Sequence, residues 1–181
     1  MRRAIVDVDG TLWDLHGPLN TLLSKLFPGF PNELPKDWNY FLSYITKDQF
    51  FAAVDSVHRS QLQYPPFLGA DHLFSLLSQL DLEIVVASHR AYNTAHTLAE
   101  WLSVNGLRPY STLYTGPDKT RFIRKGDIVI DDAPGTIDFA LKKGATSYYV
   151  SWPWNKDSGG SSHPNLWDLA NTLWEDYHAS I

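Results

Sequence analysis

Residues 4–12, Ala-Ile-Val-Asp-Val-Asp-Gly-Thr-Leu, decide how this chain folds. The stretch begins with apolar and β-branched residues, which is typical of a buried strand. It then runs through Asp7 and Asp9 into Gly10, which is typical of a strand that ends at a turn. We therefore expect a buried strand that brings two carboxylates to one edge of a sheet.

Three further apolar runs resemble this strand, and helical stretches separate them. The runs cover residues 82–87, 127–130 and 145–150, and the clearest helices cover 93–104 and 134–143. Alternating strands and helices predict βαβ units, and hence a parallel sheet with helices on both faces. The predicted fold class is α/β with a Rossmann-like core. Ligands bind such sheets beyond the carboxyl ends of the strands.

Residues 12–80 interrupt the alternation, because they are rich in proline and aromatic residues and indicate several helices without a strand. Within them, Thr46-Lys47-Asp48-Gln49 has the pattern of a capping box. We interpret residues 12–80 as a small helical cap, and residues 1–11 with 81–181 as the catalytic core. An insertion directly after the first strand is expected to close over a ligand site and exclude water. Residues 152–163 are expected to form a loop before a final helix over 164–177.

Composition excludes several classes of protein. The 181 residues contain no cysteine, so a thiol nucleophile, a zinc-thiolate site and a disulfide framework are absent. The net charge of −5 argues against stable nucleic-acid binding, which needs clustered lysine and arginine. No stretch approaches the roughly 20 apolar residues of a membrane span. We expect a cytoplasmic protein with no membrane partner, and a homodimer is compatible with the sequence.

A second acidic pair follows another apolar run. Asp131 and Asp132 come after residues 127–130, so four carboxylates would gather at one edge of the sheet. Such crowding requires compensating charge, and oxygen-rich sites suit Mg²⁺. Ser88 adds a hydroxyl at the same edge, and Lys119 precedes the run at 127–130.

Taken together and in order, these residues resemble the four motifs of the haloacid dehalogenase-like phosphohydrolases. The motifs are residues 7–12, Ser88 after an apolar strand, Lys119, and residues 128–132 (Ile-Val-Ile-Asp-Asp). The resemblance covers nearly the whole chain and implies a Rossmann-like core, Mg²⁺ dependence and a covalent aspartyl-phosphate intermediate.

The same resemblance implies a role for each motif residue. Asp7 is the expected nucleophile, Asp9 the expected general acid and then base, and Ser88 and Lys119 are expected to hold the phosphoryl oxygens. The implied metal ligands are the Asp7 side chain, the Asp9 backbone carbonyl and Asp132, with Asp131 in support.

Within that superfamily, the chain is most similar to the 5′(3′)-deoxyribonucleotidases, including their bacterial and phage relatives. The similarity lies in residues 64–70 (Tyr-Pro-Pro-Phe-Leu-Gly-Ala), 116–120 (Gly-Pro-Asp-Lys-Thr) and 131–134 (Asp-Asp-Ala-Pro), and in the tryptophan-rich final helix. It implies hydrolysis of nucleoside monophosphates, with deoxyribonucleotides as the leading candidates. The chain departs from that family at Ala133, at His89-Arg90 and at Leu15, where substrate preference is decided.

Substrate contacts are expected from both parts of the chain. From the core we expect Ser88, His89, Arg90 and Lys119, and from the cap we expect Tyr44, Ile45 and Thr46. The expected partner is a small phosphate monoester. A sugar phosphate, a phosphoprotein or a polynucleotide 3′-phosphate stays open as the substrate class. A phosphatase fold kept only for binding is disfavoured, because Asp7, Asp9 and Lys119 are all present.

Overall fold

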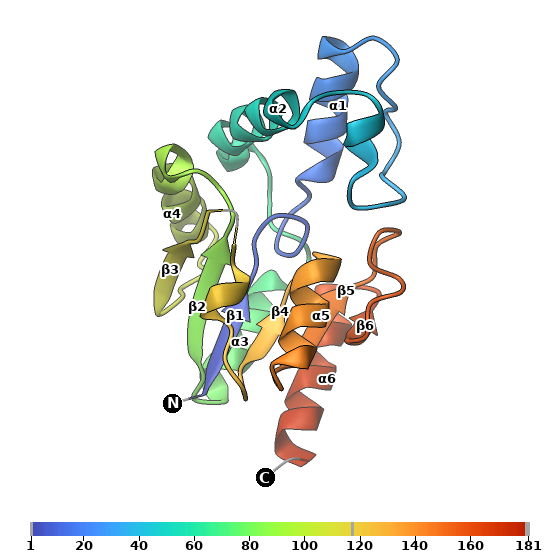
Figure 1. Cartoon of the computed structure of the whole chain (residues 1–181). Coiled ribbons are helices and arrows are strands. Elements are labelled where there is room, and N and C mark those ends of the chain that lie inside the picture. Colours follow the sequence, from blue (N-terminus) through green and yellow to red (C-terminus); the bar gives the residue numbers. More distant parts are fainter. Residues whose placement is uncertain (1, 117, 180–181) are drawn as a thin grey trace.

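The computed structural model describes residues 2–116 and 118–179. In this part of the chain, six parallel strands form one sheet in the order β3-β2-β1-β4-β5-β6. The strands are β1 (Arg3–Val6), β2 (Glu83–Ser88), β3 (Ser111–Tyr114), β4 (Ile128–Ile130), β5 (Thr146–Val150) and β6 (Ser161–His163). Helices flank the sheet on both faces (Figure 1), which confirms the predicted Rossmann-like α/β fold.

The α-helices are α1 (His16–Leu26), α2 (Lys47–Arg59), α3 (Ala70–Gln79), α4 (Ala95–Val104), α5 (Pro134–Lys142) and α6 (Leu166–Ala179). Short 3-10 helices are η1 (Tyr40–Ser43), η2 (Gln61–Gln63), η3 (Tyr92–Thr94) and η4 (Thr120–Phe122). None of the helices described is both long and apolar enough to cross a membrane.

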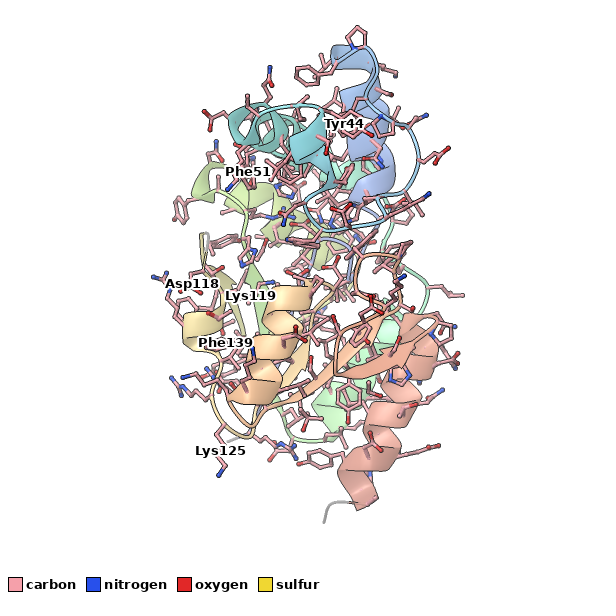
Figure 2. The ribbon with its side chains drawn as sticks, turned by 45° about the vertical axis from the view of Figure 1, so that its right-hand side comes forward. Tyr44, Phe51, Asp118, Lys119, Lys125 and Phe139 are labelled. Atoms are coloured by element: carbon pink, nitrogen blue, oxygen red, sulfur yellow. The ribbon has the colours of Figure 1, made fainter. Side chains whose placement is uncertain are left out.

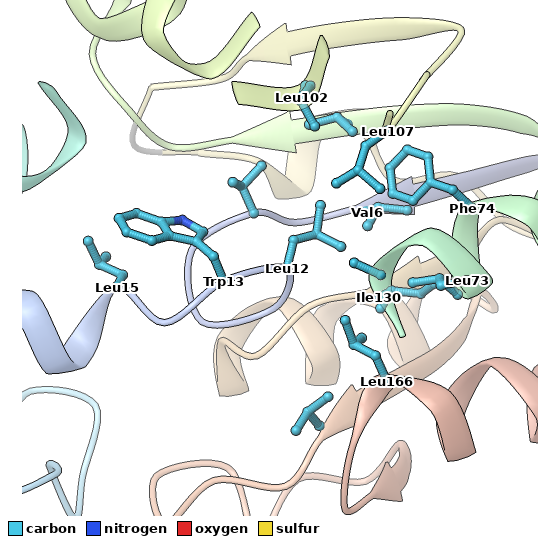
Figure 3. Close-up of a cluster of buried hydrophobic side chains, with 14 of the residues drawn as sticks. Val6, Leu12, Trp13, Leu15, Leu73, Phe74, Leu102, Leu107, Ile130 and Leu166 are labelled. Atoms are coloured by element: carbon cyan, nitrogen blue, oxygen red, sulfur yellow. The ribbon is translucent and has the colours of Figure 1, made fainter. Parts of the chain in front are cut away.

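The two faces of β1 pack against different helices, because successive strand residues point to opposite sides. Ala4 and Val6 belong to the larger apolar cluster, to which α3, α4 and α6 contribute (Figure 3). Ile5 belongs to a smaller cluster that includes Ala140 of α5. Burial on both faces explains why the strand is a continuous apolar run in the sequence.

Two strands occur where the sequence predicted none. β3 is half-buried throughout and lies at one edge of the sheet, and β6 lies at the other edge within the segment predicted to be a loop. Edge strands are covered on fewer sides than central strands, so Ser-Thr-Leu-Tyr and Ser-Ser-His carry no apolar run that would reveal them.

Helices α1 and α2 lie above the carboxyl ends of the strands in Figure 1, while α3 lies against α6 and β2 beside the sheet. The segment interpreted as the cap therefore contains one helix of the core layers. The predicted capping box is confirmed: the Thr46 hydroxyl accepts from the Gln49 backbone N–H, and the Gln49 side chain accepts from the Thr46 N–H. Phe41 and Phe50 stack with their ring centroids 3.8 Å apart inside this segment.

Candidate active site

The acidic residues meet at the carboxyl ends of two neighbouring central strands. Val6 pairs with Ile130 in the sheet, so Asp7 after β1 and Asp131 after β4 leave the sheet side by side. The Asp7 backbone N–H donates to the Ile130 carbonyl at 2.8 Å, which extends the pairing by one residue. Sheet register therefore places the carboxylates, as the sequence predicts.

Lys119 lies buried between two of these acids (Figure 2). Its Nζ donates to Asp7 Oδ1, and to Asp131 Oδ2 at 2.8 Å, and the residue is 1% exposed. Burial alone would lower the pKa of Lys119, but Asp131 and Asp7 outweigh it and hold the pKa above its ordinary value. Lys119 is therefore an ammonium ion shared by two carboxylates.

One ammonium does not offset all the negative charge. Burial raises the pKa of Asp7 well above its usual range, and Asp131 and Asp132 add to this effect against the attraction of Lys119. Burial also raises the pKa of Asp132. The site thus holds a deficit of positive charge.

Asp7, Asp131 and Asp132 form a group that could hold a metal ion, because one carboxylate oxygen from each lies within 4.8 Å of the others. All three are buried, and oxygen donors of this kind are preferred by Mg²⁺. Gly10, at φ +80°, leaves the space beside Asp132 free, since a Cβ there would collide with the Asp132 carboxylate. These residues fit Mg²⁺. The Asp9 carbonyl stays a predicted ligand.

Hydrogen bonds fix the orientation of these ligands. Asp131 Oδ1 accepts from the Ala133 backbone N–H at 2.9 Å, and Asp132 Oδ2 accepts from Trp154 Nε1 at 3.2 Å. Such donors restrict the rotation of a carboxylate that would otherwise turn away from its neighbours.

Asp9 lies in a second polar cluster beside the first. Its Oδ1 accepts from Trp13 Nε1 at 2.8 Å and from Arg90 Nη2 at 2.9 Å, and its Oδ2 lies 3.0 Å from His58 Nε2. Burial alone would raise the pKa of Asp9, but His58 and Arg90 outweigh it, so the pKa lies below its ordinary value. Asp9 is therefore a carboxylate with both oxygens bound.

Arg90 links Asp9 to the end of β2 and to η2. Its backbone N–H and Nε donate to the buried Ser88 Oγ at 3.3 and 3.2 Å, and Nη1 donates to Gln61 Oε1 at 2.7 Å. Burial lowers the pKa of the neighbouring His89, and Lys119 adds to this effect. The edge of β2 thus supplies a hydroxyl and a buried guanidinium beside Asp9.

Comparison with known proteins connects this arrangement to a fold. No protein-family model and no curated protein matches the chain. Among solved structures, a haloacid dehalogenase-like hydrolase from Streptococcus pneumoniae is 18% identical, with a TM-score of 0.65 over 95% of this chain and 98% of that one. CbbY from Rhodobacter sphaeroides, solved with phosphate, is 13% identical, with a TM-score of 0.60 over 93% of this chain and 96% of that one.

A third similar structure is the L-2-haloacid dehalogenase from Xanthobacter autotrophicus, solved with chloropropionic acid covalently bound. It is 12% identical, with a TM-score of 0.61 over 96% of this chain and 98% of that one. The chain has the fold of the haloacid dehalogenase-like hydrolases. Because proteins of this fold include dehalogenases and a phosphate-binding protein, the reaction must be argued from the side chains.

The haloacid dehalogenase-like fold brings most of the predicted core residues together. Asp7, Asp131 and Lys119 are in direct contact, with Asp132 beside them, and Arg90 joins Asp9 to Ser88. These contacts form two adjoining clusters at one edge of the sheet.

The predicted cap residues have contacts within the cap. Ile45 is buried in the apolar core, the Thr46 side chain caps α2, and the Tyr44 ring is half-exposed with its edge against Phe30. Their contact with a substrate stays a prediction.

Sequence reasoning missed four residues of the site: His58, Gln61, Trp13 and Trp154. One signal could have identified His58. Phe50, Val54 and Val57 have the spacing of a buried helix face, and His58 is the next position of that face. A polar side chain in such a stripe needs a buried partner.

Proposed function

We propose that this chain is a Mg²⁺-dependent phosphatase that hydrolyses small phosphate monoesters through an aspartyl-phosphate on Asp7. The observation that carries the proposal is the buried Lys119 ammonium shared by Asp7 and Asp131, within an acidic group that could hold a metal ion. A nucleophile that approaches a phosphate dianion needs positive charge on both reactants, and this arrangement supplies it.

The chain's own residues account for both halves of the reaction. In the first half, a carboxylate oxygen of Asp7 attacks phosphorus, the ester P–O bond breaks, and a protonated Asp9 gives its proton to the leaving oxygen. In the second half, Asp9 takes a proton from water, the water oxygen attacks phosphorus, and the acyl phosphate P–O bond breaks to release Asp7 and inorganic phosphate. Lys119 and Ser88 donate hydrogen bonds to the phosphoryl oxygens.

Mg²⁺ bound by Asp7 and Asp132 would offset the negative charge of the acids and of the phosphoryl group. The raised pKa of Asp7 shows how unfavourable the ionised nucleophile is among the acids alone. Added positive charge favours the carboxylate form, and the carboxylate is the nucleophile.

Two features favour phosphate ester hydrolysis over dehalogenation. A halide leaves as an anion and needs no proton, whereas an alkoxide leaving group needs one, and Asp9 stands two residues from Asp7 to supply it. The acidic group also repels a carboxylate substrate unless a cation is present.

Within this class, we propose nucleoside monophosphates, and deoxyribonucleotides in particular, as substrates. Support comes from the sequence similarity in residues 64–70, 116–120 and 131–134; Pro117 lies outside the described residues. The cap also carries partly exposed aromatic rings, among them Trp38, Tyr44 and Phe51. A nucleobase stacked on such a ring gains about 1–3 kcal/mol.

A substrate panel tests this proposal. Phosphate release is measured from 5′- and 3′-deoxyribonucleotides, ribonucleotides, a sugar phosphate, a phosphopeptide and an oligonucleotide 3′-phosphate, each with Mg²⁺ or EDTA. We expect Mg²⁺-dependent turnover that is highest on deoxyribonucleotides and lost in Asp7→Asn. Asp138→Asn, an exposed aspartate of α5, is the matched control.

The panel separates the chemistry from the choice of substrate. Turnover confined to the sugar phosphate or the phosphopeptide would refute the nucleotide assignment and keep the role of Asp7. Absence of metal-dependent phosphate release from every ester would refute the phosphatase assignment itself.

A further inference from the structure

The cap reaches into the site at one carboxylate. Of the groups that bind Asp9, Trp13 and Arg90 donate to Oδ1 and come from the segments that follow β1 and β2. The group at Oδ2 is His58 Nε2, at 3.0 Å, from the last turn of the cap helix α2. Because an ionised carboxylate only accepts hydrogen bonds, Nε2 is the donor in this contact.

His58 is built for this single contact. Its side chain is 2% exposed, and its Nδ1 is buried without a hydrogen-bond partner in the part of the chain that the structure describes. A buried polar atom without a partner costs free energy that an apolar residue at this position would avoid. The ring therefore retains a polar group at a cost, and the hydrogen bond to Asp9 is what it makes in return.

A second contact from the same segment supports the first. Gln61, three residues beyond His58, accepts from Arg90 Nη1 at 2.7 Å, and the same guanidinium donates to Asp9 and to Ser88. The end of α2 and η2 thus hold Asp9 directly and through Arg90. When this segment moves away from the strand ends, both contacts are lost together.

We propose that His58 is a positioning residue for Asp9: its Nε2–H fixes the carboxylate plane, so that Asp9 faces the leaving group only when the cap lies over the site. This inference rests on the proposed phosphatase function, because it assigns Asp9 the proton transfer. It goes beyond that function by making the cap part of the acid–base machinery.

Two substrates with different leaving groups test the proposal. The alkoxide released from an alkyl ester such as deoxythymidine 5′-monophosphate needs a proton, whereas p-nitrophenyl phosphate releases a stable phenolate that needs none. The ratio kcat/KM covers the steps up to departure of the leaving group, so later hydrolysis of the aspartyl-phosphate does not affect it. Where the panel ranks another alkyl ester higher, that ester replaces the nucleotide.

The variants separate the hydrogen bond from the bulk of the ring. His58→Leu keeps apolar volume and removes the donor, His58→Gln keeps an N–H near the position of Nε2, and His58→Asn places its N–H too short to reach Asp9. Arg59→Leu and Arg59→Gln change the exposed next residue of α2 and serve as controls. Thermal unfolding of each full-length variant in Mg²⁺ shows whether it is folded.

We expect His58→Leu and His58→Asn to lower kcat/KM on the alkyl ester by at least about tenfold, a part of the usual effect of a general acid. On p-nitrophenyl phosphate we expect a loss of less than about threefold, and we expect His58→Gln to restore most of the alkyl-ester activity. If His58→Leu does not fold, the comparison of His58→Asn with His58→Gln takes its place.

Three results would overturn the inference while wild-type activity stands. These are equal losses on both esters, no loss on either ester, or equal losses in His58→Gln and His58→Asn. Failure of the proposed function differs from all three, because the wild-type protein would then release no phosphate from either ester in Mg²⁺.

Discussion

The strand edge and the cap are built in opposite ways. At the edge, backbone pairing of β1 with β4 fixes three acids and Lys119 in a buried ionic cluster. In the cap, packing of helices and aromatic rings places the side chains, and several rings remain partly exposed. The edge can perform the same chemistry on many substrates, whereas the cap can change its surface without disturbing the acids. Substrate choice is therefore expected to depend on the cap.

The largest effect on stability should come from Lys119. Lys119→Met leaves Asp7 and Asp131 without the cation that they share, and removing one partner from a buried ionic cluster costs about 3–5 kcal/mol. We expect the free energy of unfolding in urea to fall by this amount, and phosphate release to be lost. Lys142→Met, at an exposed lysine of α5, is the control. A loss below about 1 kcal/mol would mean that the edge does not depend on this charge.

Metal binding should stabilise the edge next most strongly. A ligand present at 100 times its Kd stabilises the folded state by about 2.7 kcal/mol. We expect saturating Mg²⁺ to raise the melting temperature of the wild type and of Asp138→Asn, and to have little effect on Asp132→Asn. An equal rise in all three proteins would place Mg²⁺ outside the acidic group.

These two predictions concern residues that the sequence itself identified. Asp7 and Asp131 each follow an apolar run, and parallel strands deliver their carboxyl ends to the same edge, so the contact follows from topology. Lys119 has no such position in a strand, and only the resemblance to a known set of motifs indicated its role. Its place between the two acids required the structure.

The contribution of the cap could not be predicted in the same way. His58 lies 49 residues from Asp9, and their contact depends on the angle at which α2 crosses the strand ends. Periodicity shows which face of α2 is buried, but it does not show what that face meets. The edge strands β3 and β6 were missed for a related reason, since their polar sequences carry no pattern that burial would impose.

Loss of the capping box should weaken the cap by a smaller amount. Thr46→Ala removes the acceptor for the Gln49 N–H, and an N-cap of this kind contributes about 1 kcal/mol. Thr46→Ser keeps the hydroxyl and should behave like the wild type in thermal unfolding. If Thr46 also contacts the substrate, KM will change in Thr46→Ser by more than its stability does.

The smallest effect on stability should come from the exposed rings of the cap. Tyr44 is 53% exposed and Phe51 is 57% exposed, unlike Phe41, which is buried against Phe50 (Figure 2). Tyr44→Ser and Phe51→Ser should each change the free energy of unfolding by no more than about 0.5 kcal/mol. A ring that stacks on a base nevertheless contributes about 1–3 kcal/mol to binding. KM for a nucleotide should then rise, while KM for a sugar phosphate stays unchanged. If both values of KM stay unchanged, neither ring reads the base, and the buried contacts at His58 and Gln61 become the means by which the cap acts on the site.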